Sequence, residues 1–111
     1  MDLQIELNSK IKQLEFSIKE LRKNGTEYAQ AEKEYKQLLR VECLRLRDDG
    51  MAIGMIDKIC YGIPSVAEAR YKRDVTEAIY KANQEAINSI KLQLRLIEAQ
   101  IEREFGTNLS D

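Results

Sequence analysis

The chain has 111 residues, of which 18 are basic and 19 acidic, and it contains one proline and no histidine or tryptophan. Such a length allows one domain at most, and a third of the residues being charged is typical of long solvated helices rather than of sheet or disorder. The balanced charge disfavours strong sequence-independent DNA binding, which needs an uncompensated cationic surface.

The first predicted helix covers residues 3–47. Apolar residues recur along it at spacings of three and four, which places them on one helix face: Ile11, Leu14, Ile18, Leu21, Gly25, Tyr28, Tyr35 and Leu39. At Asn24-Gly25-Thr26 the helix either breaks, with Thr26 capping a second helix, or continues, with Gly25 allowing a neighbouring helix to approach closely. The unbroken register from Leu21 to Tyr28 favours the continuous helix.

Glu32 falls at an inward position of this face, opposite Ala82 or Asn83. It is either a buried polar group that fixes the register or a side chain whose carboxylate reaches the edge of the seam. The second interpretation is favoured.

A short helix is predicted between residues 52 and 60. Asp49-Gly50 ends the helix before it, because glycine adopts the left-handed terminal conformation at little cost. Met55, Ile56 and Ile59 give the short helix an apolar face. The segment Tyr61–Pro64 ends it, and Ser65–Glu68 has the pattern of a capping box at the start of the next helix.

The last predicted helix covers residues 66–105, and residues 106–111 form a polar C-terminal tail. A second apolar stripe runs along this helix: Val75, Ile79, Ala82, Ala86, Ile90, Leu94, Ile97 and Ile101. Residues 1–105 are expected to form a single domain.

The two stripes predict an all-α fold in which the chain turns near Ile56–Ile59 and the long helices form an antiparallel, coiled-coil-like hairpin with a short helix at its tip. The expected neighbours are Ile18 with Ile97, Leu21 with Leu94, Gly25 with Ile90, Leu39 with Val75, Tyr28 with Ala86, and Tyr35 with Ala78 and Ala82. Large residues thereby face small ones.

Some apolar residues lie off this seam. Leu38, Val41 and Leu44 are close enough to the tip for the short helix to cover them. Phe16, Leu92, Leu96 and Ala99 have no cover within the chain, so we expect them to mediate self-association. A dimeric four-helix arrangement is favoured, and a helix-rich partner protein is the alternative.

No catalytic chemistry is predicted. Without histidine a Glu-x-x-His di-iron site is excluded. Only Asp74 and Glu77 have the three-residue spacing of the magnesium-binding carboxylates in helical nucleotide pyrophosphatases, and no Gly-rich phosphate loop occurs. Cys43 and Cys60 are interpreted as core side chains rather than a disulfide, and there is no CxxC pair for zinc. We therefore expect no enzyme activity, no cofactor and no metal.

The segment 51–73 has the outline of a helix-turn-helix. Lys58 stands where a small residue is usual, and nearby carboxylates nearly cancel the basic charge, so a capped hairpin tip is the favoured interpretation. A basic cluster near the tip could still contact phosphate or an acidic protein: Arg40, Arg45, Arg47, Arg70, Lys72 and Arg73.

The stretches AEKEYKQLLRVECLRLRDDGM and KRDVTEAIYKANQEAINSIKLQLRLIEAQIEREF resemble small helical accessory proteins encoded by phages and prophages of low-GC Gram-positive bacteria. The most specific parts are Ala31-Glu32-x-x-Tyr35, Leu46-Arg47-x-x-Gly50-Met51 and Arg73-Asp74-Val75. The resemblance implies an intracellular accessory protein of a phage. It carries no catalytic motif and so assigns no functional residue.

The expected function is a non-enzymatic protein-interaction module that binds a host or phage protein, as an inhibitor of host defence or as an adaptor in replication or recombination. The alternatives are a nucleic-acid-binding accessory protein acting through the tip and a structural coiled-coil protein of the virion. No stretch approaches the ~20 apolar residues of a membrane span, and the charged N-terminal segment lacks a signal-peptide core. We therefore expect no membrane partner and a cytoplasmic location, in the host if the chain is phage-encoded.

Overall fold

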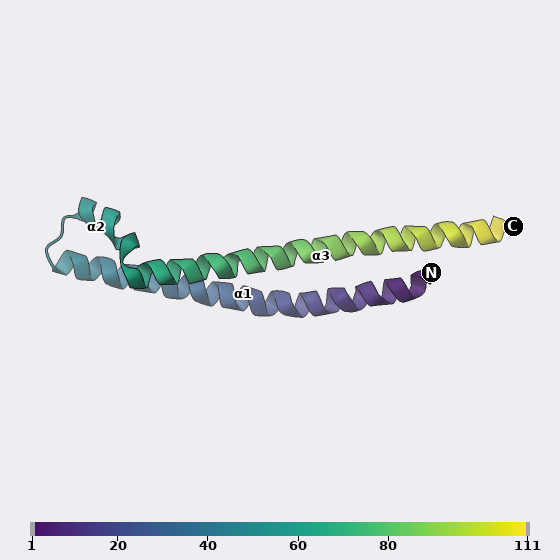
Figure 1. Cartoon of the computed structure of the whole chain (residues 1–111), viewed down its shortest axis with the longest axis horizontal. Coiled ribbons are helices and arrows are strands. Elements are labelled where there is room, and N and C mark those ends of the chain that lie inside the picture. Colours follow the sequence, from purple (N-terminus) through teal and green to yellow (C-terminus); the bar gives the residue numbers. More distant parts are fainter. Residues whose placement is uncertain (1, 111) are drawn as a thin grey trace. The chain divides into compact units, whose positions relative to one another are not determined.

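Four helical elements follow one another in the computed structural model, which describes residues 2–110 and the side chains of residues 2–106 (Figure 1). Helix α1 spans Leu3–Asp48, α2 spans Ile53–Ile59, the 3-10 helix η1 spans Cys60–Gly62, and α3 spans Pro64–Ser110. No strand occurs in this part of the chain, which confirms the all-α class. None of these helices is long and apolar enough to cross a membrane.

Helix α1 is continuous through Asn24, Gly25 and Thr26, in agreement with the favoured interpretation. Gly25 lies close to α3, because a Cβ atom added there would meet Tyr80 Cε1 at 3.1 Å. Its neighbour is therefore Tyr80 and not the predicted Ile90. The absence of a side chain at Gly25 leaves room for the Tyr80 ring.

The C-terminus of α1 is closed by a glycine in the left-handed conformation. Gly50 has a φ of 88°, and its N–H donates to the Arg47 carbonyl at 3.0 Å. The Met51 N–H donates to the Leu46 carbonyl at 3.1 Å, and the Met51 side chain packs against the cluster that contains Leu46. This combination is a Schellman motif with its hydrophobic contact, and it confirms the predicted role of Gly50.

Helix α2 and η1 pack on the last turns of α1. Leu46, Ile56 and Cys60 form a buried cluster, and further side chains pack against it: Leu39, Cys43, Met51 and Ile63. The predicted cover of Leu38, Val41 and Leu44 is wrong for the last two, which stay exposed. They lie beside, and not within, the face formed by residues 39, 43 and 46.

Helix α3 begins and ends outside its predicted bounds. Pro64 is its first residue, and the Ala67 N–H donates to the Ile63 carbonyl at 2.9 Å. Proline suits the first helical position because its φ is preset and its missing N–H would have no partner there. Ser65 therefore lies inside the first turn, and the predicted capping box is wrong.

The C-terminal end of α3 lies at Ser110, so the predicted tail is helical through residue 110, and Asp111 lies outside the described residues. The single glycine in this stretch, Gly106, is a weak stop signal, because glycine inside a helix costs only about 1 kcal/mol relative to alanine.

Inward positions of α3 follow a strict seven-residue repeat. The buried and half-buried residues of this repeat are Val66, Ala69, Arg73, Thr76, Tyr80, Asn83, Ile87, Ile90, Leu94, Ile97 and Ile101. The predicted stripe is correct from Ile90 onwards. It is wrong for Val75, Ile79, Ala82 and Ala86, which are all exposed. The same seven-residue repeat continues through this part of α3, and here it places polar residues at the inward positions.

Helix α1 shows the same repeat. Its inward residues are Leu3, Leu7, Lys10, Leu14, Ser17, Leu21, Asn24, Tyr28, Ala31, Tyr35, Leu38 and Glu42. Glu32 lies next to this stripe, is half-buried, and forms an ion pair with Lys36 at 3.4 Å. Its carboxylate thus reaches the edge of the seam, as the favoured interpretation expects.

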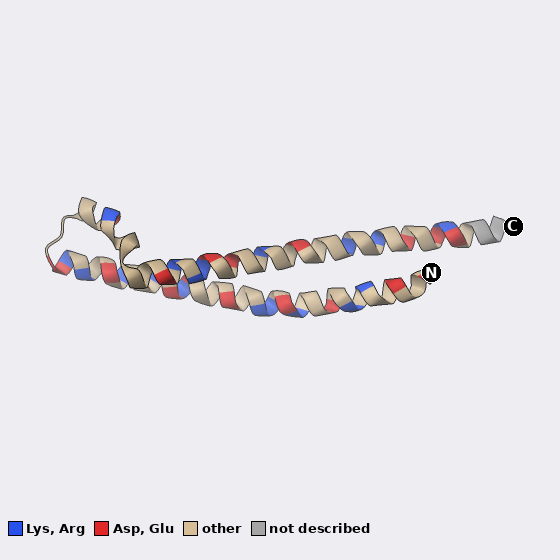
Figure 2. Ribbon diagram, viewed as in Figure 1, with Lys and Arg blue, Asp and Glu red and all other residues tan. Residues whose placement is uncertain are grey.

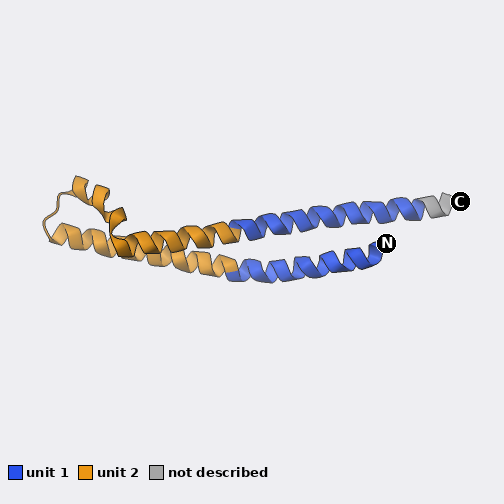
Figure 3. Cartoon of the chain, in the orientation of Figure 1, with its two compact units in different colours: residues 1–23, 81–111 blue, residues 24–80 orange. Residues whose placement is uncertain are grey.

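The chain divides into two compact units, coloured separately in Figure 3. Unit 2 comprises residues 24–80, and unit 1 comprises residues 1–23 with 81–111. Each unit pairs a segment of α1 with a segment of α3. The single-domain assignment of residues 1–105 stays a prediction.

Contacts in unit 2 define an antiparallel register. Tyr28 donates a hydrogen bond to Glu77 Oε2 at 3.0 Å, and its ring centroid lies 5.9 Å from that of Tyr80. Farther along α1, Tyr35 contacts Arg73. The predicted neighbour of Tyr28 is Ala86, which lies six residues beyond Tyr80 and nine beyond Glu77. The predicted pairing is therefore displaced by about two helical turns.

In unit 1 the Asn83 side chain bridges the two helices, since its Nδ2 donates to the Ser17 carbonyl at 3.1 Å. The buried residues of this unit are Ile87, Ile90 and Ile97. The predicted pairs Ile18–Ile97 and Leu21–Leu94 are incompatible with the Ser17–Asn83 contact, since fourteen residues of helix span about 21 Å.

Replacing Gly50 by alanine is predicted to lower the free energy of unfolding by about 1–2 kcal/mol, because an L-residue is strained at positive φ. Gly62→Ala is the matched control, since Gly62 has an ordinary φ and open space at its Cβ position. Urea titrations of both variants measure the difference. Equal stability of the two variants would contradict the assigned terminus of α1.

Tyr28→Phe is predicted to destabilise the chain by about 1–3 kcal/mol, because the hydrogen bond to the Glu77 carboxylate is lost. Tyr71→Phe, at an exposed position of α3, is expected to leave the urea midpoint unchanged. If both substitutions act alike, Tyr28 does not face Glu77.

Candidate functional site

The predicted basic cluster lies entirely in unit 2. Figure 2 shows that acidic residues are interspersed with the basic ones along both long helices. On α1, Arg45 pairs with Glu42 at 2.8 Å and with Asp49 at 3.4 Å. Arg40 and Arg47 are exposed on the same helix.

The α3 members of the cluster contact other parts of unit 2. The Arg70 guanidinium lies 5.5 Å from the centroid of the Tyr61 ring, and Lys72 lies 3.6 Å from Glu34. A hydrogen bond from Gln30, followed by the charge of Lys72, lowers the pKa of Glu34. These contacts fasten α3 to η1 and to α1.

Arg73 is the most enclosed member of the cluster. Its guanidinium lies 4.7 Å from the centroid of the buried Tyr35 ring and pairs with Asp74 at 2.8 Å. The hydrogen bond to Asp74 raises the pKa of Arg73. A cation over an aromatic face contributes about 0.5–2 kcal/mol, more where water is excluded. Arg73 therefore stabilises the helix pair, and its charge is directed into the chain.

Large apolar side chains are exposed in unit 1 at the positions predicted for self-association. Phe16 is 65% exposed, Leu92 52% and Leu96 61%. Leu92, Leu96 and the half-buried Ala99 are spaced by four and three residues, so they form one ridge on α3. Phe16 belongs to α1 and lies in a different feature.

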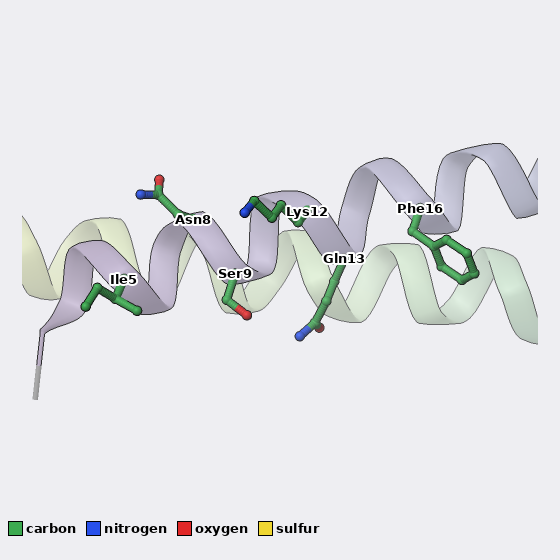
Figure 4. Close-up of a pocket in the computed structure, with 6 residues that line it drawn as sticks. All are labelled: Ile5, Asn8, Ser9, Lys12, Gln13 and Phe16. Carbon is green, nitrogen blue, oxygen red and sulfur yellow. The ribbon is translucent and has the colours of Figure 1, made fainter.

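That feature is an open groove of about 550 Å³ along α1 (Figure 4). Ile5 and Phe16 lie at its two ends, about 16 Å apart along the helix axis. The four residues between them are polar: Asn8, Ser9, Lys12 and Gln13. The groove thus has an apolar side chain at each end and hydrogen-bonding groups between them, and it is open rather than an enclosed cavity.

A second exposed apolar surface lies in unit 2 and was not predicted. Tyr71 is 66% exposed, Val75 39% and Ile79 47%, and their four-residue spacing places them on one face of α3. The sequence interpretation assigned Val75 and Ile79 to the seam. A seven-residue repeat relates Ile87, Ile90, Leu94 and Ile97. Extending this repeat towards the N-terminus predicts that Val75 and Ile79 face outward.

Comparison with known proteins finds no matching family model, no matching curated protein and no matching solved structure.

Arg73→Ala is predicted to lower the free energy of unfolding by about 1 kcal/mol or more, because the buried Tyr35 ring loses its cationic partner. Arg40→Ala, which removes an exposed charge from α1, is the control and should change stability by less than about 0.5 kcal/mol. Urea unfolding and duplex-DNA retention at two salt concentrations are measured on both variants. Unchanged stability together with a loss of salt-dependent DNA retention would assign Arg73 to nucleic-acid binding instead.

Proposed function

We propose that the chain is a non-enzymatic interaction protein that associates through helical surfaces, with a second copy of itself as the first partner. The observation that carries this proposal is the exposure of Phe16, Leu92 and Leu96, three large apolar side chains in unit 1. Large exposed apolar side chains that lie close together, as Leu92 and Leu96 do on α3, are typical of association surfaces.

The proposal includes the arrangement of the chain as an antiparallel, coiled-coil-like hairpin. The seven-residue repeat of inward residues on both long helices supports it, since that spacing keeps a seam facing a partner helix. The antiparallel contacts within unit 2, from Tyr28–Glu77 to Tyr35–Arg73, support it as well.

A two-fold arrangement of two copies is supported by the presence in unit 1 of both an exposed apolar ridge on α3 and a groove on α1. The α1 groove between Ile5 and Phe16 in one copy would receive the α3 ridge of Leu92 and Leu96 from the other, and the reverse contact would form at the same time. The product is a four-helix arrangement.

The resemblance to small phage-encoded helical proteins supports a further partner, a host or phage protein. The exposed face of Tyr71, Val75 and Ile79 in unit 2 supports the same proposal, because it lies outside the unit proposed for self-association. Nucleic-acid binding through the tip is less well supported, since Arg45, Arg70, Lys72 and Arg73 all have partners on the chain.

Phe16→Glu combined with Leu96→Glu is predicted to convert the dimer to monomers, because two carboxylates would be desolvated at each half of the interface. The matched control is Val41→Glu with Tyr71→Glu, which introduces the same charge at equally exposed positions of unit 2. Light scattering coupled to gel filtration measures the mass. A monomeric wild type, or a double variant that keeps the dimer mass, would contradict the proposed interface.

A further inference from the structure

Two thiols lie together in the cluster that holds α2 and η1 on α1. Cys43 is half-buried on α1, and Cys60, the first residue of η1, is 2% exposed. The Cys43 side chain packs against the cluster of Leu46, Ile56 and Cys60. Burial, and then a hydrogen bond with the Cys60 thiol, raises the pKa of Cys43. Packing in one cluster brings the two cysteine side chains close together, although they are seventeen residues apart in the sequence.

We infer that Cys43 and Cys60 are a modification site, a dithiol that oxidises to an intramolecular disulfide and thereby fastens η1 to α1. The two residues belong to different elements, so a bond between them would be a crosslink between α1 and η1 and not within one helix. The Cys60 thiol donates a weak hydrogen bond to the Asp57 carbonyl at 3.9 Å.

Hydrogen peroxide serves as the oxidant. The sulfur of Cys43, the more accessible thiol, attacks one peroxide oxygen, the O–O bond breaks, and the departing hydroxide takes up a proton to become water. Cys43 is then a sulfenic acid. The Cys60 sulfur attacks the Cys43 sulfur, the S–O bond breaks, and the hydroxide leaves as a second water with the proton of Cys60. Two thiols and one peroxide give one disulfide and two waters.

The surroundings of Cys43 determine how fast this happens. The thiolate is the nucleophile, and its raised pKa makes the thiolate fraction at neutral pH smaller than that of an ordinary cysteine. The rate of oxidation should therefore rise between pH 7 and pH 9 as the thiolate fraction increases. Asp57 acts in the same direction as burial, because its negative charge disfavours a thiolate at Cys43.

The crosslink would attach α2 and η1, a segment that is not stable on its own. Helix α2 has seven residues, too few to be stable alone, and no side chain caps its N-terminus. It depends on the cluster around Leu46 for its position. A Cys43–Cys60 bond would keep η1, and α2 before it, attached to α1 when that packing opens.

The test uses the full-length protein, treated with hydrogen peroxide at pH 7 and pH 9 and then analysed by intact-mass and peptide-mapping mass spectrometry without reduction. We expect a loss of two hydrogen atoms per chain, a crosslinked peptide pair containing Cys43 and Cys60, and reversal by dithiothreitol. Amide hydrogen exchange over residues 53–63 should slow several-fold on oxidation.

Cys43→Ser and Cys60→Ala are the control variants, and neither should lose the two hydrogens or show slower exchange over residues 53–63 after peroxide. The peptide map of the wild-type protein shows whether the Cys43–Cys60 disulfide forms, even if a control variant folds poorly. Oxygen addition to separate cysteines, disulfides between two chains, or a Cys43–Cys60 bond that forms only in urea would each overturn the inference.

Discussion

The seven-residue repeat of α3 determines which of its side chains face α1 and which face solvent. The repeat is strongest where it is apolar, at Ile87, Ile90 and Ile97, which are buried. Its phase continues towards Pro64 and turns Arg73, Thr76 and Asn83 inward, although all three are polar. A helix cannot change its inward face within a few residues without a break, and α3 has none.

Polar residues at inward positions need partners, because an unsatisfied buried polar group costs about 1–3 kcal/mol. The described side chains have them: Arg73 contacts Tyr35, Asn83 donates to the Ser17 carbonyl, and the Thr76 hydroxyl lies 2.9 Å from the carbonyl oxygens of Lys72 and Arg73. No fully buried side-chain nitrogen or oxygen in this set lacks a partner. The partners of Arg73 and Asn83 lie on α1, so the paired helix satisfies both polar side chains.

The sequence predicted the helices well and their pairing poorly, and the reason is physical. Helix ends depend on local chemistry such as the left-handed conformation of Gly50, which can be read from a few residues. The pairing depends on where α3 starts beside α1. The spacing of apolar residues does not determine this register, because two stripes with the same seven-residue repeat pair equally well when one is displaced by seven residues. The contacts that decide it, Tyr80 beside Gly25 and Tyr28 with Glu77, are between residues of no distinctive pattern.

The same distinction explains which parts of the candidate site were predicted. The exposure of Phe16, Leu92 and Leu96 was expected because they lie off the stripe under any register. The prediction for Val75 and Ile79 is wrong because apolar character alone does not establish burial, and apolar side chains are common on surfaces. The basic cluster was seen as a group, but the aromatic partners of Arg70 and Arg73 come from distant positions in the sequence.

The two units differ in the elements that they contain. A pair of helices buries one face of each, and a further apolar face can be buried only against a third element. In unit 2 the last turns of α1 have such an element, because α2 and η1 enclose Leu46 and Cys60. Unit 1 contains only segments of α1 and α3. Leu92 and Leu96 stay exposed in this unit, and the proposed association with a second copy would cover them.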